Sequence, residues 1–312
     1  MIHDNYGRPV LNLRISITQR CNLRCPYCHR EGEVASPSIE MTRDEIVRIT
    51  GIAVGLGISR VKLTGGEPLL RPDILDIVKG IAELRGLKDF SMTTNGTKLA
   101  PLAKGLHKNG LNRVNISIPS LDAETYYSLM GGDLNDVLKG IRAAVNANLF
   151  PVKLNMLVLK NVNNHEIPKM ISFAEQTNTI LQLIELEPLN ISMSYYKRHH
   201  YPLDIVEEEL AKQARQVKIR EDMQNRKVYF LSKAKVEVVR PIENTEFCAR
   251  CTRLRVTSDG WLKPCLMRTD NLVDILTPLR KEANNEDLTR LFMEAVKRRE
   301  PYYKLTQNLK TQ

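Results

Sequence analysis

The feature that most constrains the fold is a regular alternation of short strand-like segments and longer helix-like segments. Apolar residues recur at strand spacing and then at helical spacing along the first 190 residues. The strand-like runs are residues 14–18, 60–64, 90–95, 113–118, 152–159 and 181–187, and the helix-like runs between them begin near residues 42, 72, 99, 135 and 167. Because helices that connect parallel strands cross over in a right-handed sense, this order predicts an α/β fold with six parallel strands.

The strand-like runs carry polar residues at every second position, so one face of the predicted sheet is polar. These residues are Arg14, Ser16 and Thr18; Arg60, Lys62 and Thr64; Ser91, Thr93 and Asn95; Asn115 and Ser117; Lys153 and Asn155; and Glu185 and Glu187. A closed eight-stranded barrel fills its interior with bulky apolar side chains, and a doubly wound sheet buries both faces under helices. The pattern therefore predicts an incomplete (β/α)6 TIM-type barrel whose concave inner face holds polar ligands.

After residue 190 the alternation gives way to a different pattern. It indicates a charged helix at residues 205–217 and two strands at 227–232 and 236–240. A hairpin follows at 254–265, with Asp259 and Gly260 in its turn, and a final helix at 287–300. We therefore expect a barrel over residues 1–190 and a small C-terminal unit over residues 191–312 that covers the open side of the barrel.

Composition favours a globular protein of a reducing compartment. The chain is 42% hydrophobic and 26% charged, it has no apolar run long enough for a bilayer, and its N-terminus lacks a secretory pattern. We expect a cytoplasmic enzyme without membrane contact, in which six cysteines do not form disulfides. The net charge of +10 fits a polyanionic ligand or a basic surface. Nucleic-acid binding would favour basic residues interleaved with aromatic ones, and only residues 195–201, YYKRHHY, show this combination. Such a stretch is usually a solvated loop, so we expect no nucleic-acid binding.

The first cysteine group, Cys21, Cys25 and Cys28, follows the first strand-like run with the spacing C-x3-C-x2-C. Loops at this position carry the chemistry of many α/β folds. Three thiolates can hold three irons of a [4Fe–4S] cluster and leave the fourth iron open. The alternative is a structural zinc site, which normally needs four ligands; His29 adjoins Cys28 and is poorly placed to be the fourth.

The second cysteine group, Cys248, Cys251 and Cys265, contains all the remaining cysteines of the chain. A second cluster would again have one iron without a cysteine or histidine ligand, whereas zinc would need a carboxylate. If the residues after Cys251 form a strand, Arg253 and Arg255 point to the same side. Two guanidinium groups beside an open iron suit a phosphate chain, and further basic residues on the inner face of the barrel, Arg14, Lys62 and Lys153, add to them.

The first cysteine group and the Gly-Gly-Glu-Pro stretch at 65–68 together resemble the radical S-adenosylmethionine superfamily. Over most of residues 8–300 the resemblance narrows to the GTP 3′,8-cyclase family, also called molybdenum cofactor biosynthesis protein A. The segments that carry it are LNLRISITQRCNLRCPYC, VKLTGGEPLLRPD, SMTTNG, RVNIS and FCARCTRLRVTSDGWLKPCL. The resemblance implies a lyase with two [4Fe–4S] clusters and S-adenosylmethionine as cofactors.

The resemblance also implies a role for each matching residue. Cys21, Cys25 and Cys28 would hold the first cluster, and Cys248, Cys251 and Cys265 the second, whose free iron would bind the guanine of GTP. S-adenosylmethionine would contact Tyr27, Gly65, Gly66, Glu67, Ser117 and Glu187. GTP would contact Arg14, Lys62, Thr93, Lys153, Arg253 and Arg255. The candidate catalytic residues are the first three cysteines with Arg253 and Arg255.

The implied reaction is the first step of molybdenum cofactor biosynthesis. A 5′-deoxyadenosyl radical made from S-adenosylmethionine takes the 3′-hydrogen of GTP, and C3′ then bonds to C8 of the same guanine. The product is (8S)-3′,8-cyclo-7,8-dihydroguanosine 5′-triphosphate, which a downstream cyclic pyranopterin monophosphate synthase uses. The family further implies an electron donor of the flavodoxin or ferredoxin type and is compatible with a homodimer.

The sequence departs from the family pattern at three places. Many members end in Gly-Gly, whereas this sequence ends NLKTQ and its internal Gly131-Gly132 is no substitute. Position 62 is lysine where arginine is common, and Glu187 stands where an apolar residue is usual, so Glu187 is expected to act through its backbone. Two other functions stay open: a two-cluster radical enzyme that modifies a peptide, which generally has more cysteines, and an iron–sulfur protein that binds nucleic acid.

Overall fold

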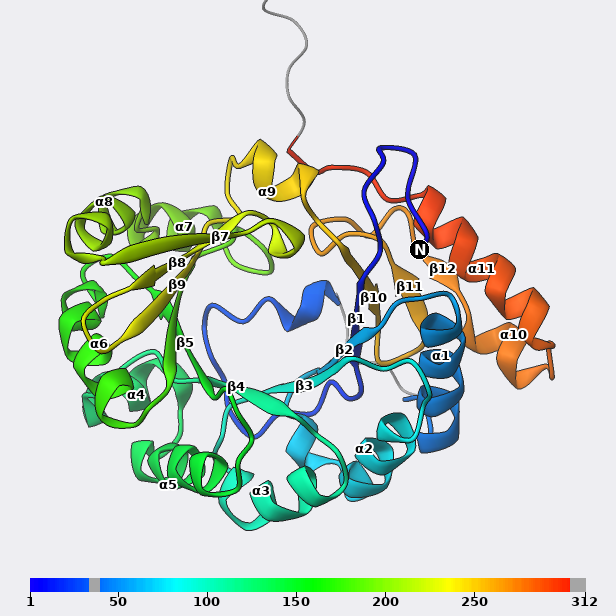
Figure 1. The fold of residues 1–312 in the computed structure, drawn as a ribbon, viewed down its shortest axis with the longest axis horizontal. Helices are drawn as coiled ribbons and strands as arrows, with labels where there is room; N and C mark the ends of the chain where they lie inside the picture. The colour runs from blue at the N-terminus through cyan, green and yellow to red at the C-terminus, as the bar shows by residue number, and fades with distance from the viewer. Residues whose placement is uncertain (34–39, 304–312) are drawn as a thin grey trace, which may run out of the picture.

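The centre of the molecule is one strongly curved sheet in the computed structural model, which describes residues 1–33 and 40–303 (Figure 1). The six predicted strands are parallel neighbours in chain order: β1 (Asn12–Ser16), β2 (Arg60–Thr64), β3 (Asp89–Thr94), β4 (Arg113–Ser117), β5 (Lys153–Val158) and β6 (Ile180–Glu185). The helices that connect them lie outside the sheet: α1 (Arg43–Gly55), α2 (Ile74–Ala82), α3 (Leu99–Lys108), α4 (Ala123–Met130), α5 (Leu134–Asn146) and α6 (Ile167–Gln176). The predicted incomplete barrel is confirmed.

Local sequence signals set several of these helices. Helix α1 begins at Thr42, whose hydroxyl accepts from the backbone N–H of Glu45 while the Glu45 carboxylate accepts from the N–H of Thr42. The sequence analysis missed α4, a helix of two turns that is capped by Asp122 at its start and by Gly131 in the left-handed region (φ 73°) at its end. So short a helix shows too little apolar periodicity to be recognised.

The chain beyond residue 190 extends the same sheet at both ends. At one end β10 (Arg253–Val256) pairs in parallel with β1 and continues into β11 (Trp261–Lys263) and β12 (Val273–Asp274). At the other end β9 (Lys235–Val239) pairs in parallel with β6 and continues into β8 (Arg226–Phe230) and β7 (Gln216–Arg220). Among the described residues the edge strands β12 and β7 do not pair with each other, so the barrel stays open.

The C-terminal helices are short except for the last. They are α7 (Met193–His199), α8 (Asp204–Gln213), α9 (Thr245–Ala249), α10 (Leu276–Arg280) and α11 (Asn285–Lys297). The predicted helix over 205–217 was too long, because Val217 and Ile219 alternate with charged residues and pair with β8 as strand β7. Residues 195–201, expected as a loop, largely form α7, on which Lys197 and Arg198 are exposed.

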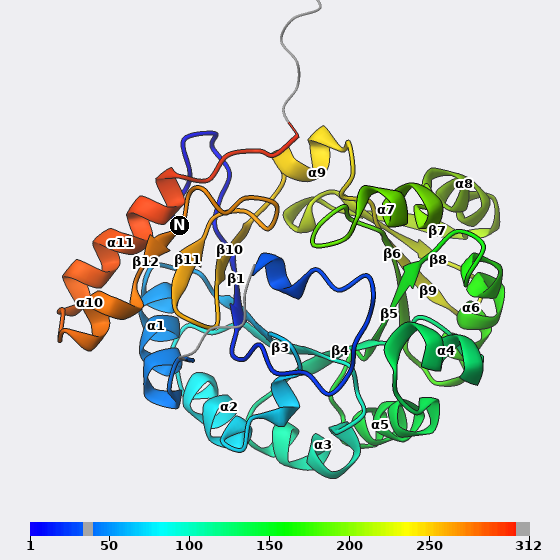
Figure 2. The same ribbon diagram turned by 180° about the vertical axis from the view of Figure 1, so that it is seen from behind.

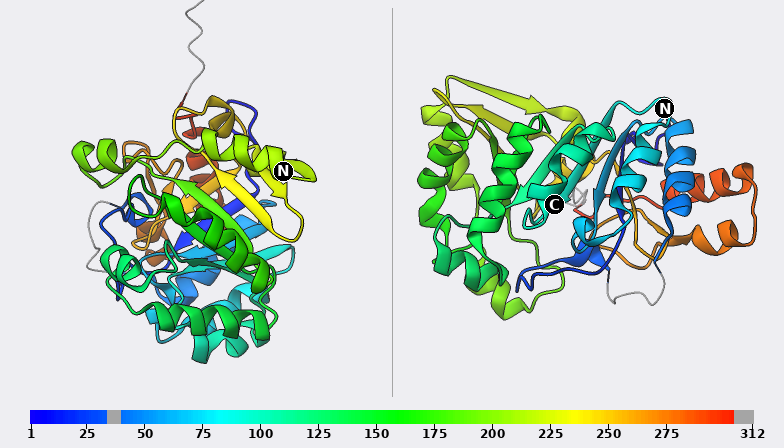
Figure 3. Two further views of the ribbon diagram at one scale, coloured as in Figure 1. Left: turned by 90° about the vertical axis from the view of Figure 1, so that its left-hand side faces the viewer. Right: turned by 90° about the horizontal axis from the view of Figure 1, so that it is seen from below.

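Apolar and polar side chains separate across the barrel wall. On β1 and β2, Leu13, Ile15 and Leu63 are fully buried between the sheet and its helices, whereas the polar residues that alternate with them line the inside. The loop that follows β1 crosses the opening of the barrel (Figure 2). From the side, the helices form an outer layer, and α10 and α11 lie at one end of the molecule beyond α1 (Figure 3). Within the described chain, no helix has the length and apolar character that a membrane span requires.

Candidate active site

The inside of the barrel holds a cavity of about 370 Å³, within the range of small-molecule sites. All six cysteines line it, although they come from two segments more than 200 positions apart in the chain. The other predicted site residues on its wall are Arg14, Tyr27, Lys62, Gly65, Gly66, Thr93, Ser117, Lys153, Glu187, Arg253 and Arg255. The structure therefore brings together every predicted site residue except Glu67.

The first cysteine group is packed against Met130, the last residue of α4. The Sδ atom of Met130 lies 3.3 Å from Cys25 Sγ and 3.0 Å from the Tyr27 hydroxyl. Burial, and then the neighbouring Cys28 and Cys21, raise the pKa of Cys25 to about 12. Three crowded thiols resist losing their protons unless a cation compensates the charge, and metal ligation does so. Their chemistry fits a metal cluster.

Gly65 and Gly66 contact the backbone that leads into the first cysteine group. A Cβ atom on Gly65 would lie 2.3 Å from the carbonyl oxygen of Thr18, and one on Gly66 would lie 2.3 Å from that of Arg20. The N–H of Gly66 donates to the Thr18 carbonyl at 2.7 Å. The sequence analysis predicts cofactor contact at these glycines, and the structure shows that the chain's own loop is the neighbour that excludes a side chain.

Glu67 has a different position from the one predicted. Its side chain is fully buried away from the cavity, and its carboxylate accepts hydrogen bonds from the N–H of Leu69, the Thr94 hydroxyl and the N–H of Asn95 at 3.0, 2.7 and 2.6 Å. Asn95 Nδ2 in turn lies 3.9 Å from Cys21 Sγ. Because its acceptor sites face these donors, Glu67 supports the cysteine loop through Asn95 and does not line the cavity.

The second cysteine group has a mixed electrostatic environment. Burial raises the pKa of Cys248 and of Cys265. Burial acts in the same direction on Cys251, but the guanidinium groups of Arg299 and Arg253 outweigh it and lower the pKa of that thiol. A zinc ion would need at least three His, Cys, Asp or Glu side chains around one point. Residues 1–33 and 40–303 contain no group of side chains with that arrangement.

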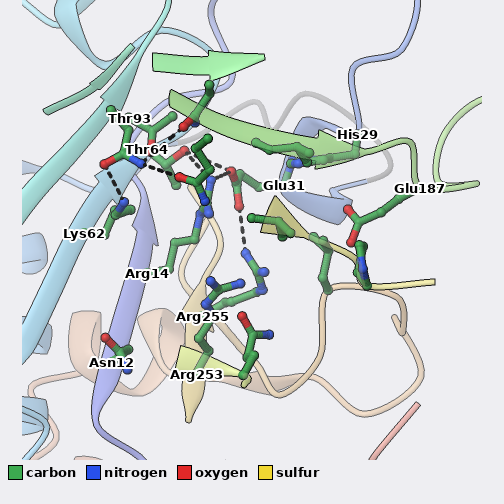
Figure 4. A pocket seen from close by; sticks show the side chains of 18 of the residues that line it. Asn12, Arg14, His29, Glu31, Lys62, Thr64, Thr93, Glu187, Arg253 and Arg255 are labelled. Carbon is green, nitrogen blue, oxygen red and sulfur yellow. Dashed lines mark hydrogen bonds and ion pairs between the residues drawn. The ribbon is translucent and has the colours of Figure 1, made fainter. Parts of the chain in front are cut away.

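Two cations on the cavity wall form no salt bridge among the described residues. Lys62 Nζ makes one hydrogen bond, 3.1 Å to Asn115 Oδ1, and the guanidinium of Arg253 makes neither a hydrogen bond nor an ion pair there (Figure 4). Burial, and then the charge of Arg113 and Arg14, hold the pKa of Lys62 well below its ordinary value. Burial and nearby arginines likewise lower the pKa of Arg253. Such half-buried cations without a salt bridge favour an anionic ligand.

Glu31 pairs with two of the predicted GTP-binding arginines. Its Oε1 lies 2.5 Å from Arg14 and 2.9 Å from the Thr64 hydroxyl, and its Oε2 lies 2.8 Å from Arg255 (Figure 4). Burial opposes ionisation, but Arg14, His29 and Arg255 lower the pKa of Glu31 to about 2. The sequence analysis missed this residue, because a single glutamate after the cysteines gives no spacing signal.

We expect Glu31→Gln to destabilise the folded protein at pH 7 by about 3 kcal/mol, because it leaves the buried guanidinium of Arg255 and the half-buried guanidinium of Arg14 without their counter-charge. The pKa of Glu31 is lower in the folded protein than in the unfolded chain, where it is near 4.5. The ionised carboxylate therefore stabilises the fold fully above about pH 4.5, and this stabilisation is lost as the pH falls through about 2. Urea unfolding of the oxygen-free protein at pH 7 measures the difference.

Glu33→Gln is the matched control, since Glu33 is also buried but accepts hydrogen bonds from Ser258 and forms no salt bridge among the described residues, although the charge of Lys263 acts on it. Burial raises the pKa of Glu33 to about 7, so its ionisation costs stability as the pH rises from about 4.5 through 7, and its replacement should not destabilise the protein at pH 7. Equal destabilisation by the two variants would contradict the pairing assigned to Glu31.

Models of known protein families match the chain in two segments. Residues 15–174 match the radical SAM superfamily, and residues 179–305 match the family described as Molybdenum Cofactor Synthesis C. Two solved structures share the fold: SuiB of Streptococcus suis bound to S-adenosylmethionine (TM-score 0.62, 18% identity, 82% of this chain and 60% of that chain) and native anSMEcpe with bound AdoMet and Kp18Cys peptide (TM-score 0.62, 20% identity, 92% and 80%). The fold and the first cysteine motif thus define a radical SAM enzyme, which carries a [4Fe–4S] cluster and binds S-adenosylmethionine.

Relatives of nearly the same length are more specific. The chain is 52% identical to the "Probable GTP 3′,8-cyclase" of Thermococcus kodakarensis (97% of this chain, 100% of the relative), 49% to that of Pyrococcus horikoshii (97% and 98%) and 44% to that of Methanocaldococcus jannaschii (97% and 99%). The chain belongs to the GTP 3′,8-cyclase family. The resemblance found in the sequence is confirmed.

Proposed function

We propose that this chain binds GTP in the barrel cavity between its two cysteine groups. As a member of its family the chain is a radical SAM lyase that converts GTP into (8S)-3′,8-cyclo-7,8-dihydroguanosine 5′-triphosphate, the first step of molybdenum cofactor biosynthesis. The observation that best supports the binding site is the presence of both cysteine groups on one cavity wall with the unpaired cations Lys62 and Arg253. A nucleoside triphosphate supplies the negative charge that these cations lack.

The second cysteine group holds a second [4Fe–4S] cluster in this proposal. Cys248, Cys251 and Cys265 supply three ligands, and the remaining iron binds the guanine. The cations Arg14, Lys62, Lys153, Arg253 and Arg255 bind the phosphates, and Thr93 lies beside them. S-adenosylmethionine occupies the side near the first cysteine group, next to Tyr27, Gly66, Ser117 and the backbone of Glu187.

The residues of the chain position the nucleotide for an intramolecular reaction. When bound, the first cluster and S-adenosylmethionine supply the one-electron cleavage that makes removal of a ribose hydrogen possible. The chain holds the nucleotide at its base and its phosphates at once, so that C3′ and C8 of the same molecule stay close. The barrel wall and the loop over its opening keep bulk water away from the reacting atoms.

The same proposal extends to organisation and partners. Residues 1–190 form the part that binds S-adenosylmethionine, and residues 191–312 supply the second cluster together with part of the nucleotide site. An electron donor of the flavodoxin or ferredoxin type reduces the enzyme in the cytoplasm, and cyclic pyranopterin monophosphate synthase uses the product. The enzyme is compatible with a homodimer. The C-terminal residues NLKTQ, which replace the Gly-Gly ending of many members, lie outside the described residues.

Product analysis tests the proposal. The protein is reconstituted with iron and sulfide without oxygen and incubated with S-adenosylmethionine, dithionite and GTP, and the products are identified by mass spectrometry. We expect 5′-deoxyadenosine and a new nucleotide that separates from GTP on chromatography but has the same mass, because C3′ loses one hydrogen and the reduced base gains one. Formation of 5′-deoxyadenosine beside unaltered GTP would contradict the assignment of the substrate. A peptide or RNA added in place of GTP tests the two alternative functions.

A further inference from the structure

A second group of buried charges lies on the wall of the same cavity, built mainly by the strands of the C-terminal region. Its centre is Glu237 on β9, whose side chain is 1% exposed. The carboxylate contacts the ammonium group of Lys153 and lies 3.2 Å from Arg220 Nη1 and 3.4 Å from Arg226 Nη1. Of the four residues in this group, only Lys153 was assigned to GTP binding from the family resemblance.

Glu237 does not neutralise the cations that surround it. Three positive groups share one carboxylate whose pKa is held far below its ordinary value by Lys153, Arg226 and Arg220 despite burial. Arg226 is only 7% exposed, and its Nε atom is buried without a hydrogen-bond partner in the described part of the chain. Excess buried cations and an unsatisfied donor are costly in an empty cavity, and an anionic ligand offsets both.

The arginine at position 226 connects this group to the cations already assigned to GTP. Burial lowers its pKa, and the charges of Arg220 and Arg14 lower it further. Of the charges around Arg253, that of Arg226 lowers its pKa the most. Both Arg220 and Arg226 line the cavity. Arg253, Arg226, Arg220 and Lys153 therefore line one and the same cavity.

Local structure fixes the orientation of Arg226 before any ligand binds. Gln224 and Asn225 adopt left-handed backbone conformations (φ 67° and 53°) that form the turn before β8. The turn brings Gln224 Oε1 to 2.7 Å from Arg226 Nη2, while Glu237 holds Nη1. A guanidinium fixed at two corners presents its remaining N–H groups with little loss of conformational freedom, as phosphate recognition requires.

We propose that Arg226 and Arg220 bind the phosphate chain of the nucleotide and make binding depend on the number of phosphates. The inference rests on the proposed function, since it places a nucleoside triphosphate in this cavity. It adds to the family site two residues that strands β7 and β8 supply. Each guanidinium donates charge-assisted hydrogen bonds to phosphate oxygens, which a nucleoside without phosphates cannot accept.

Nucleotide binding to anaerobically reconstituted protein tests the proposal. Dissociation constants for GTP, GDP, GMP and guanosine are measured by calorimetry for the wild type, Arg226→Gln and Arg220→Gln. Each variant should weaken GTP binding roughly tenfold to a hundredfold, as expected for loss of a charged hydrogen bond, and leave guanosine binding unchanged. The affinity ratio of GTP to guanosine therefore falls.

Lys227→Gln is the matched control. Lys227 neighbours Arg226 on β8, but it is 44% exposed, pairs with Glu207 and does not line the cavity, so removing its charge should leave all four constants unchanged. Circular dichroism checks that each variant folds. Because Arg220 is 31% exposed, Arg220→Gln keeps the test available if the more buried Arg226→Gln fails to fold.

Two outcomes overturn the inference: an unchanged GTP to guanosine ratio in the folded arginine variants, or an equal loss for guanosine and GTP, which would indicate contact with the base. A third outcome concerns the proposed function and is recognised separately. If the wild-type protein binds neither GTP nor guanosine, the proposed nucleotide site is wrong, and the inference is wrong with it. If the wild type cyclises GTP and the arginine variants bind nucleotides as the wild type does, only the inference is wrong.

Discussion

Cys265→Ser should abolish formation of the cyclised nucleotide while S-adenosylmethionine is still cleaved to 5′-deoxyadenosine. Cys265 lines the cavity with Cys248 and Cys251, and its loss removes a proposed ligand of the second cluster only. Without that cluster the guanine has no anchor, and the reacting carbons are no longer held together. Because such positioning contributes about 7 kcal/mol or more, product formation should fall at least about a hundred-thousandfold.

Cys25→Ser is the matched variant in the first group. It should abolish both reactions, because Cys25 is a proposed ligand of the cluster that cleaves S-adenosylmethionine. Both variants are reconstituted without oxygen, and 5′-deoxyadenosine and the cyclised nucleotide are quantified in the same samples. Equal loss of the two products in Cys265→Ser would contradict the division of labour between the cysteine groups.

Lys62→Met should have opposite effects on GTP binding and on stability. The ammonium group of Lys62 is held inside the cavity with a lowered pKa and only Asn115 as a hydrogen-bond partner in the described chain. Removal of a cation that binds phosphate should cost about 2 kcal/mol or more of binding free energy, or at least about a thirtyfold loss of GTP affinity. Replacement of a half-buried charge that has no salt bridge by an apolar side chain of similar size should stabilise the nucleotide-free protein by about 1 kcal/mol.

Two measurements check this expectation: the dissociation constant for GTP, and the midpoint of thermal unfolding without nucleotide. Lys139→Met is the control, because Lys139 lies on the outer helix α5 with 62% of its side chain exposed. Its replacement should change neither quantity appreciably. If Lys62→Met lowers the unfolding midpoint as well as the affinity, then Lys62 stabilises the empty cavity, and its role as an anion-binding residue is wrong.

Sequence periodicity was enough to predict the central fold. Strands β1 to β6 alternate between apolar residues that face the helices and polar residues that face the cavity, and this period of two is visible without coordinates. The pairings of the C-terminal strands were not predictable, because β9 and β10 join opposite ends of the sheet although only 13 positions separate Val239 from Arg253. Nothing in their local composition distinguishes one edge of a sheet from the other.

The candidate site, like the fold, was predictable from the sequence in one part and not in another. Cysteine spacing and alternating basic residues were enough to predict that the six cysteines and Arg14, Lys62 and Lys153 face one cavity. Glu67 was placed wrongly relative to the cavity because its neighbours in the motif do line it, while its own carboxylate turns back onto Asn95. Glu31 and Glu237 were missed because their importance depends on arginines that lie far away in the sequence. An isolated acidic residue within the apolar strand VEVV was the one signal that could have pointed to Glu237.

The most direct test of the account follows a single hydrogen atom. The reconstituted enzyme is given S-adenosylmethionine, reductant and GTP that carries deuterium at C3′, and 5′-deoxyadenosine is analysed by mass spectrometry, with unlabelled GTP as control. If GTP lies between the two cysteine groups with its ribose beside the cofactor, 5′-deoxyadenosine gains one deuterium as the cyclised nucleotide forms. If 5′-deoxyadenosine stays unlabelled while the nucleotide is consumed, the proposed arrangement of cofactor and substrate in this cavity is wrong.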